Sequence, residues 1–337
     1  MADKVTSFDV ARRAGVSQSA VSRVFTPGAS ASAATRDKVM KAAEDLGYRP
    51  NTLARAMITG KSRVIGVVVA YLENQFYPMA LEHLDRALKD RGYHILLFMA
   101  KNDDSVGQIV EDLMSYQVEG IITASVAMTN DIAKQCDDAG IPVVMFNRGR
   151  ETGNLAQVTS DNIQGGRTVA NFLASAGHRK IAHISGWQGS STGVDRMRGF
   201  VDGLQDHGLQ PFAIEDGQYN QEIASGIARR LCSTTDRPDA IFVGNDHMAF
   251  AVMDTLRFEL GLSVPDDVSI VGYDDVPISA WPAYDLTTIR QPINKMVNAT
   301  VDVLLSRIEH GSASERIQIP GPLKIRGSAR KPKGFNP

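Results

Sequence analysis

Residues 6–26 have the sequence TSFDVARRAGVSQSAVSRVFT and decide the fold of the N-terminal part of the chain. Apolar residues recur there at helical spacing on two faces, formed by Val10, Ala11 and Ala14 and by Val21 and Val24. Gly15 stands between the two patterns and breaks the first helix. The stretch therefore predicts two short helices joined by a turn that contains glycine.

The residues that follow predict a third helix. Val39, Ala42, Ala43 and Leu46 have the spacing i, i+3, i+4, i+7, and no strand-like run precedes residue 60. Capping signals mark the helix ends: Thr6 with Asp9 and then Ser17 at the starts of the first two helices, and Gly47 with Pro50 after the third. We therefore expect residues 1–50 to form an all-α head.

Charge is unevenly distributed along the 337 residues, although the whole chain has a net charge of only -2. Residues 1–63 contain eleven Lys or Arg against five Asp or Glu, and the remainder contains 25 against 33. A basic head on an acidic body is typical of a head that contacts phosphates. A solvated basic surface without a partner is the alternative.

The second helix carries polar residues on the side away from its valines. Gln18 and Ser19 lie in its first turn and Arg23 one turn later, where side chains of a helix-turn-helix protein contact base edges in the major groove. An arginine bound through two hydrogen bonds to guanine discriminates by roughly 1 to 3 kcal/mol. Ser17 and the helix N-terminus would bind a phosphate. Two short helices with a glycine turn also occur in helical bundles that bind no DNA.

From Arg63 onward, short apolar strands alternate with amphipathic helices. We expect strands at residues 64–70, 95–99, 120–124, 143–146, 181–185, 240–244 and 268–272, and helices at 79–91, 166–176, 197–207 and 248–260. This alternation predicts parallel sheets with helical crossovers. The number of strands favours two sheets, with a lobe boundary near residues 155–162 and a final crossing near 287–292. Residues 63–330 would thus form a two-lobed α/β body, and residues 51–62 a hinge helix and linker.

Polar and aromatic residues follow several predicted strands, where the carboxyl ends of two facing sheets form a cleft. They are Phe76 and Tyr77, Asn147 and Arg148, Asn245 and Asp246, Asp274 and Asp275, and Arg196 at the start of a helix. Carboxylate, amide and guanidinium groups beside rings are typical of a site for a polyhydroxylated ligand, and a nucleobase or organic acid would fit almost as well. Asp246 is equally interpretable as a helix N-cap, and Asp275 as a turn residue. Trp187 and Trp281 would be either cleft walls or packing residues.

Several classes of protein are disfavoured. The first twenty residues contain no apolar run, and no later stretch approaches the roughly eighteen apolar residues of a membrane helix, so we expect a cytoplasmic protein without a membrane partner. The two cysteines and the histidines lack metal-ligand spacing, and no nucleotide-binding motif indicates a cofactor. Gly165 and Gly166 are interpreted as a helix start. Asp246 and Asp274 could in principle hydrolyse glycosides, but no reactive pair is evident and we expect no enzyme.

Three segments resemble the lactose-repressor/galactose-repressor family of bacterial transcription regulators: DVARRAGVSQSAVSRV, TRDKVMKAAEDLGYRPN and NTLARAM. The resemblance covers some fifty contiguous residues, and the order of elements in the body continues it. It implies a helix-turn-helix head in which Gln18, Ser19 and Arg23 contact bases. The hinge is similar to the family's hinge helix, so Arg55 and Met57 are implied DNA contacts. Met57 stands where the family usually has a leucine wedged between base pairs, and packing against the body is its alternative.

The resemblance also implies a body like a periplasmic binding protein, with an effector in its cleft. It supports Phe76, Tyr77, Arg196 within DRMRGF, Asn245 within GND and Asp274 within GYDD. Tyr219 matches an aromatic wall of the family's site, whereas Asn147 and Arg148 match less closely. The implied protein is a homodimeric repressor of a pseudo-palindromic site in double-stranded operator DNA, controlled by a sugar or related small molecule. A solute-binding receptor and a sugar-processing enzyme are the alternatives, and the sign of the ligand's effect is not in the sequence.

Overall fold

The computed structural model describes residues 5–26, 29–49, 61–100, 106–126, 128–150, 155–311 and 313–334. The chain divides into two compact units, Met1–Ser62 and Arg63–Pro337, which we call the head and the body. Most of the predicted hinge, including Arg55 and Met57, lies outside the described residues.

The head contains helices α1 (Ser7–Ala14), α2 (Gln18–Val24) and α3 (Ala33–Leu46). The predicted caps are confirmed: the carboxylate of Asp9 accepts hydrogen bonds from the backbone N–H and the hydroxyl of Thr6 at 3.0 and 2.7 Å, and Ser17 caps α2. Gly15 and Gly47 both have a φ of 65°, the left-handed conformation that ends a helix. Local signals thus set the limits of these helices.

The head has one apolar core. Val10, Val21 and Val39, one from each helix, are at most 1% exposed and pack together. These are the apolar faces that the helical spacing predicted. Because valines and alanines form the inward faces of the helices, the polar side of α2 lies on the surface.

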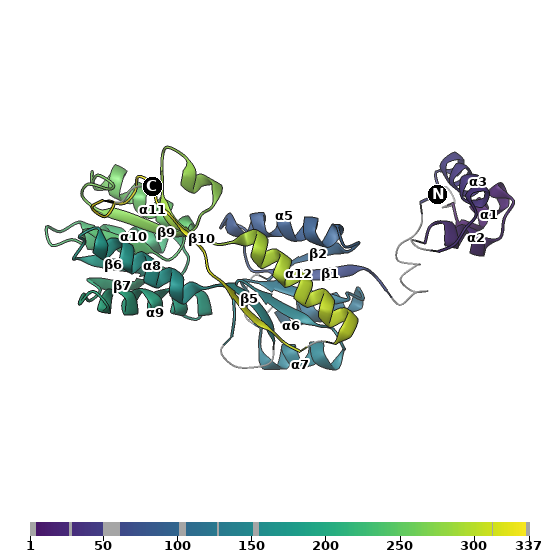
Figure 1. Ribbon diagram of the computed structural model, residues 1–337, viewed down its shortest axis with the longest axis horizontal. Coiled ribbons are helices and arrows are strands. Elements are labelled where there is room, and N and C mark those ends of the chain that lie inside the picture. The colour runs from purple at the N-terminus through teal and green to yellow at the C-terminus, as the bar shows by residue number, and fades with distance from the viewer. Residues whose placement is uncertain are drawn as a thin grey trace. The chain divides into compact units, whose positions relative to one another are not determined.

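The body consists of two six-stranded sheets (Figure 1). The first has the order β11-β5-β4-β3-β1-β2 and the second β12-β10-β9-β8-β6-β7. All pairs are parallel except β10 with β12. The strands are β1 (Val64–Val69), β2 (His94–Met99), β3 (Gly120–Ala124), β4 (Val143–Phe146), β5 (Ala156–Ser160), β6 (Ile181–Ser185), β7 (Ala213–Asp216), β8 (Ala240–Val243), β9 (Ser269–Asp274), β10 (Thr287–Arg290), β11 (Arg316–Ile319) and β12 (Leu323–Lys324).

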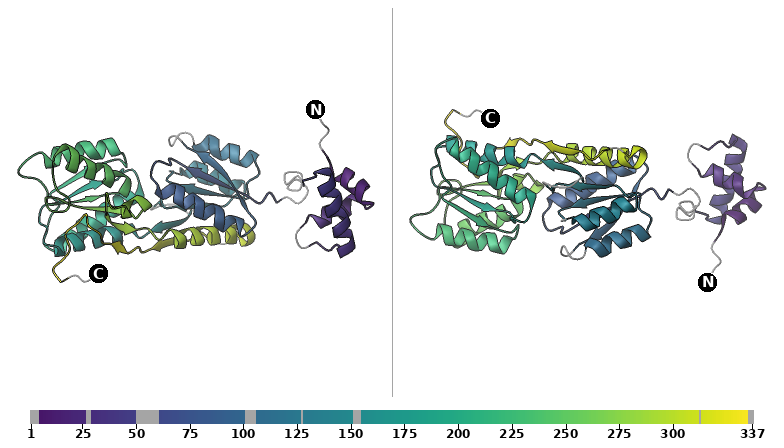
Figure 2. Two further views of the ribbon diagram at one scale, coloured as in Figure 1. Left: turned by 90° about the horizontal axis from the view of Figure 1, so that it is seen from above. Right: turned by 90° about the horizontal axis from the view of Figure 1, so that it is seen from below.

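Helices cover both faces of each sheet (Figure 2), and we call each sheet with its helices a lobe. The N-lobe carries α5 (Phe76–Lys89) and α12 (Ile293–His310) on one face and α6 (Val106–Ser115) and α7 (Asn130–Asp138) on the other. The C-lobe carries α8 (Asn162–Ser175) and α9 (Ser191–Gln205) on one face, and α10 (Gln221–Cys232) and α11 (Asp246–Asp254) on the other. None of the described helices is long and apolar enough to cross a membrane.

The chain passes between the lobes three times. It leaves the first sheet after β5, returns after β10 through α12 to β11, and joins the second sheet again at β12. The prediction that the crossing near residues 287–292 is the last one is therefore wrong. The third passage, between Ile319 and Leu323, was missed because β11 and β12 are short and only half apolar.

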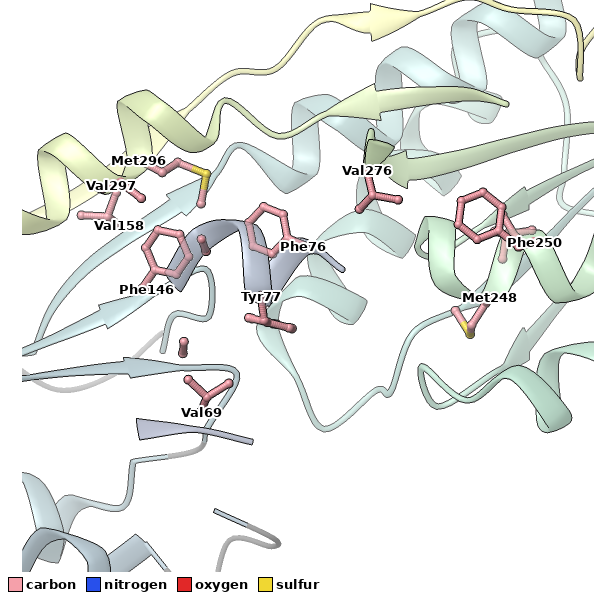
Figure 3. Close-up of a cluster of buried hydrophobic side chains, with 14 of the residues drawn as sticks. Val69, Phe76, Tyr77, Phe146, Val158, Met248, Phe250, Val276, Met296 and Val297 are labelled. Atoms are coloured by element: carbon pink, nitrogen blue, oxygen red, sulfur yellow. The ribbon is translucent and has the colours of Figure 1, made fainter. Parts of the chain in front are cut away.

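An apolar cluster extends across both lobes beside the cleft (Figure 3). Phe76 stacks on Phe146 of the N-lobe with ring centroids 6.1 Å apart. Val276 and Phe250 of the C-lobe belong to the same cluster. The first turn of α5 therefore forms part of the junction between the lobes, and Phe76 is only 2% exposed.

Helices α8 and α9 approach each other closely because glycines stand at their crossing. A Cβ atom on Gly199 would lie 1.9 Å from the carbonyl oxygen of Ile163, and one on Gly166 would lie 2.2 Å from that of Arg196. The interpretation of Gly165 and Gly166 as a helix start is wrong, since α8 begins at Asn162. These glycines instead let α9 carry Arg196 close to the second sheet.

We expect Gly199→Ala to destabilise the body by about 1 to 3 kcal/mol, because the added methyl group meets backbone that cannot move without separating the helices. The measurement is urea denaturation. Gly226→Ala in α10 is the matched control, since nothing lies within 4 Å of its added Cβ. The control should be neutral or stabilising by up to about 1 kcal/mol. Equal effects of both substitutions would contradict a packing role for Gly199.

Candidate functional site

The exposed face of α2 carries the predicted base contacts. Gln18, Ser19 and Arg23 are all exposed, whereas Val21 and Val24 on the same helix are buried. The ion pairs of the described part of the head join Arg12 to Asp9 and Arg13 to Asp45, and give Arg23 no carboxylate partner. The guanidinium of Arg23 thus remains available for an external acceptor.

The first turn of α2 is held by its own side chains. The hydroxyl of Ser17 accepts a hydrogen bond from the backbone N–H of Ala20 at 3.3 Å and lies 2.9 Å from the hydroxyl of Ser19. The amide of Gln18 donates to the hydroxyl of Ser7 at 3.3 Å. Ser17 therefore fixes the start of the helix, which is the part of a helix that attracts phosphates.

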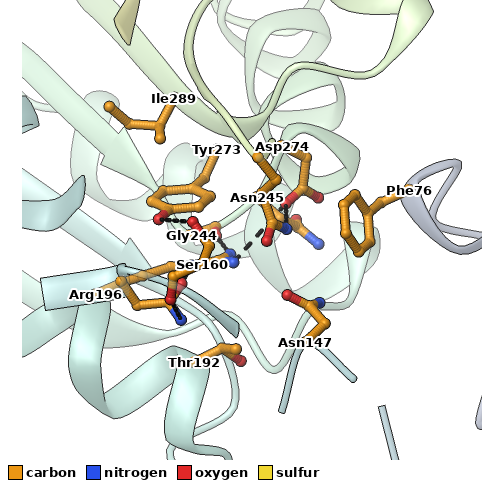
Figure 4. A network of polar contacts seen from close by, with 12 residues as sticks. Phe76, Asn147, Ser160, Thr192, Arg196, Gly244, Asn245, Tyr273, Asp274 and Ile289 are labelled. Atoms are coloured by element: carbon orange, nitrogen blue, oxygen red, sulfur yellow. Dashed lines mark hydrogen bonds and ion pairs between the residues drawn. The ribbon is translucent and has the colours of Figure 1, made fainter. Parts of the chain in front are cut away.

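In the body, a buried network surrounds Arg196 (Figure 4). Its guanidinium donates to the side chain of Asn162 at 2.9 Å and to the carbonyl of Gly244 at 2.7 Å. It lies 3.6 Å from the ring centroid of Tyr273 and 3.9 Å from a carboxylate oxygen of Asp274. Arg196 is only 3% exposed, so its orientation is fixed by packing as well as by these bonds. It is the sixth residue of α9 and does not begin the helix, which corrects the prediction.

Asp274 links the two lobes. One carboxylate oxygen accepts a hydrogen bond from the amide of Gln291 at 2.7 Å, and the other accepts one from the amide of Asn74, an N-lobe residue, at 3.1 Å. Burial raises the pKa of Asp274, and the nearby Arg196 opposes that shift. Its φ of 131° is a conformation that side chains rarely adopt, and such strain accumulates at functional sites.

The N-lobe side of the cleft is aromatic. The amide of Asn147 donates to the phenol of Tyr77 at 3.3 Å, and the ring of Tyr71 lies 5.3 Å from that of Tyr77. Burial raises the pKa of Tyr77, and Arg148 is the largest opposing influence. Asn147 has a φ of 64°, so a second cleft residue is held in the left-handed region.

Arg148 and Trp187 meet from opposite lobes. The guanidinium carbon of Arg148 lies 5.4 Å from the centroid of the Trp187 ring, and one of its nitrogens is 3.5 Å from the hydroxyl of Ser125. This contact between the lobes is compatible with both roles considered for Trp187, a cleft wall and a packing residue. Trp281 follows the short helix Pro277–Ala280 and is 55% exposed.

The remaining predicted site residues lie on the C-lobe side of the cleft. Asn245 is the N-cap of α11, where its side-chain oxygen accepts from the backbone N–H of Met248 at 2.9 Å. Tyr219 has a φ of 57°, and its phenol lies 2.9 Å from the hydroxyl of Thr192.

Three buried polar atoms of the cleft have no hydrogen-bond partner among the described residues. They are the side-chain oxygens of Asn147 and Gln291 and the side-chain nitrogen of Asn245. Buried polar groups are almost always paired, so unpaired ones in a cleft indicate where a ligand binds. Gln291 and Asn74 were missed by the sequence prediction. Gln291 directly follows β10, as Asn147 directly follows β4, but the sequence analysis did not predict β10 as a strand.

Asp246 has neither of the roles considered for it. It is the first residue of α11 rather than the cap, and both carboxylate oxygens are bonded within the protein. They accept from Thr288 and Ser279 hydroxyls at 2.6 Å each and from the backbone N–H of Val276 at 3.1 Å. Asp275 is held in ion pairs by Arg290 and Arg326 and has a φ of 58°. Both acids therefore shape the C-lobe wall.

A helix-turn-helix head with a free polar recognition face, joined in one chain to a two-lobed α/β body with a polar cleft, defines a ligand-controlled DNA-binding regulator. Residues 8–51 match the lacI family of bacterial regulatory proteins, and residues 170–329 match the periplasmic binding protein-like domain. The chain belongs to the lacI family.

Two curated relatives and one solved structure illustrate the similarity. The chain is 30% identical over 332 residues to the HTH-type transcriptional repressor PurR of Vibrio vulnificus (strain CMCP6), covering 96% of this chain and 98% of that one. It is 31% identical over 331 residues to the ribose operon repressor of Escherichia coli (strain K12), covering 96% and 99%. The structure of the lac repressor dimer bound to operator and the anti-inducer ONPF gives a TM-score of 0.87 at 27% identity, covering 97% and 99%.

Proposed function

We propose that the chain works as a homodimeric repressor that binds a pseudo-palindromic operator through its two heads. Its affinity for the operator falls or rises when a small polyhydroxylated molecule enters the cleft. The observation that carries the ligand site is the unpaired set of Asn147, Asn245 and Gln291 around the Arg196–Asp274 pair. Amides, a carboxylate and a guanidinium beside rings match the hydroxyls and the apolar face of a sugar.

The DNA contacts proposed for the head are Gln18, Ser19 and Arg23 on bases and Ser17 with the start of α2 on phosphate. Exposure of all four residues and the absence of a described acid partner for Arg23 support this assignment. Arg55 and Met57 of the hinge are proposed minor-groove contacts on the strength of the sequence alone.

Ligand binding would change operator affinity through the contact between Asn74 and Asp274. This hydrogen bond crosses the cleft at 3.1 Å. A ligand that bonds to Asp274 therefore either replaces Asn74 as its partner or adds further bonds between the lobes. Either outcome favours one arrangement of the lobes over another, and a ligand shifts an equilibrium only through such a difference in affinity. Repression is the proposed outcome at the operator, and the ligand is either an inducer that weakens operator binding or a corepressor that strengthens it.

A regulator of this kind would act in the cytoplasm, where operator DNA is, and would not catalyse a reaction. The one carboxylate pair considered for glycoside hydrolysis is Asp246 with Asp274, and Asp246 is fully engaged by Thr288, Ser279 and Val276. Among the described residues, no group of three His, Cys, Asp or Glu is placed to hold a metal ion.

Arg23→Ala is expected to weaken binding at one guanine of each half-site by about 1 to 3 kcal/mol while non-specific affinity stays nearly constant. The measurement is fluorescence anisotropy with the selected operator and with variants substituted one base at a time. Arg12→Ala is the control, because that exposed side chain pairs with Asp9. An equal loss on every sequence would mean that Arg23 touches only phosphate.

The experiment that tests the whole proposal is selection of bound sequences from random and genomic DNA by the full chain, beside a version lacking residues 1–61. The regulator predicts a two-fold symmetric site that only the full chain enriches. If no sequence is enriched, either with or without candidate ligands, the proposal is rejected in favour of a solute-binding module.

A further inference from the structure

Arg148 is a buried cation on the N-lobe side of the cleft. It is the second residue after β4 and is 9% exposed. Its guanidinium contacts neutral groups among the described residues, the Ser125 hydroxyl at 3.5 Å and the ring of Trp187 at 5.4 Å. The hydroxyl contact is at the outer limit of a hydrogen bond.

No carboxylate of the described residues lies within 4.0 Å of the Arg148 guanidinium. The other arginine buried in the cleft, Arg196, lies 3.9 Å from Asp274, and the half-buried Arg326 lies 2.6 Å from Asp275. Arg148 therefore differs from these two arginines in having positive charge without a matching negative one among the described residues.

The neighbouring phenols do not supply that negative charge. Burial raises the pKa of Tyr71 well above its ordinary value, and it raises the pKa of Tyr77 as well. Both phenols are therefore neutral near pH 7. An arginine does not lose its proton in a protein, so the unmatched charge persists. A buried ion without a partner is unfavourable, and proteins retain one where a ligand completes the pair.

A second observation concerns a cavity lined by residues that follow Arg148 in the chain. Gly149, the residue after Arg148, lines a cavity of about 790 Å³ whose described lining also includes Arg150, Arg198 and Arg316 and one acid, Asp195. The start of α9 at Ser190 and Ser191 also borders it. Excess positive charge around a cavity raises the local concentration of anions.

We propose that the effector is an anion whose carboxylate or phosphate group binds Arg148, while its hydroxyls bind Asp274, Asn245 and Gln291. This inference rests on the proposed function, because it assumes that the cleft holds the effector. The planar guanidinium presents paired N–H donors that match either anionic group. Neutral sugars would leave Arg148 unmatched and should bind more weakly.

The test compares the full-length protein with the variants Arg148→Gln and Arg148→Lys. Arg86→Gln is the matched control, since Arg86 is an exposed arginine of α5 paired only with Glu82. The probes are ribose with ribose 5-phosphate, galactose with galacturonate, and inorganic phosphate alone, all at one ionic strength. The two sugar pairs distinguish a phosphate from a carboxylate effector. Binding is measured by calorimetry and by the rise in Tm.

The expected result is that an anionic probe binds the wild type at least about tenfold more tightly than its neutral partner, and that Arg148→Gln removes this preference. Arg148→Lys should keep part of it, and Arg86→Gln all of it. The proposal is overturned if a neutral sugar binds as well as its anionic partner, if the preference survives in Arg148→Gln, or if no anion, inorganic phosphate included, gives an Arg148-dependent rise in Tm.

A second measurement needs no ligand. Because an unmatched buried charge opposes folding, Arg148→Gln should have a Tm equal to or above that of the wild type in the absence of ligand. A clear fall in Tm would mean that Arg148 serves as a structural tie to Trp187, and would overturn the proposal. If a neutral sugar releases operator from the wild type and from Arg148→Gln alike, the inference of an anionic effector fails and the proposed function stands. Failure of the full chain to select an operator would defeat the proposed function instead.

Discussion

Arg196→Ala is expected to destabilise the body by about 3 to 5 kcal/mol and to abolish the response to ligand. Removing the guanidinium leaves the carboxylate of Asp274 buried without its cation, 3.9 Å away in the intact protein. The carbonyl of Gly244 and the side-chain oxygen of Asn162 lose their hydrogen bonds at the same time.

Stability is measured by urea denaturation and the ligand response by operator anisotropy well below the Tm. The head does not include Arg196, so operator binding without ligand should persist. The double variant Arg196→Ala with Asp274→Asn should lose less stability than the sum of the two single losses, because neither charge then remains alone. Strict additivity would show that the pair is not coupled, and an unchanged ligand response would place the sensor elsewhere.

Asp246→Ala is also expected to destabilise the body by about 3 to 5 kcal/mol. Three donors lose their acceptor inside a fully buried environment: the hydroxyls of Thr288 and Ser279 and the backbone N–H of Val276. Each buried donor left unpaired costs roughly 1 to 3 kcal/mol. Because these donors lie on β10 and the segment after β9, the C-lobe wall beside Asp274 should loosen as well.

The same carboxyl gives the body a pH dependence. Burial, together with the nearby charge of Asp274, raises the pKa of Asp246 to about 7. In the unfolded chain the group titrates near its ordinary pKa of about 4. Between about pH 4 and pH 7 the carboxyl of Asp246 keeps its proton in the folded body but has released it in the unfolded chain. The stabilisation that this group gives the folded body is therefore complete below about pH 4 and is lost as the pH rises through about 7.

Denaturation of the wild type and of Asp246→Asn across this pH range measures the effect. The wild type should lose stability from pH 5 to 8, whereas the asparagine variant should lose less. Asp254→Asn is the control, since that residue accepts one hydrogen bond, from Tyr284, and belongs to the same helix. Identical pH profiles for wild type and Asp246→Asn would exclude a raised pKa at this position.

The helices of the head were predictable because their signals are local. The capping pair Thr6–Asp9 spans three residues, and the apolar spacing within each helix is visible without knowledge of the rest of the chain. The seven predicted strands of the body occur close to their expected limits, since buried parallel strands are continuous apolar runs. The strands β5, β7, β10, β11 and β12 were missed because they are short and partly polar, and their pairing depends on neighbours supplied by other segments.

The sequence by itself determined that this protein has a basic three-helix head, an α/β body with parallel sheets, and polar residues at the ends of its strands. Only the tertiary structure decided which of those residues meet. Asn74 and Asp274 are 200 residues apart and form the contact across the cleft. The carboxylate of Asp246 accepts a hydrogen bond from Thr288, which lies 42 residues later in the chain. Helix periodicity and capping are set by neighbours along the chain, whereas the partner of a buried polar group is set by which segments the sheets bring together.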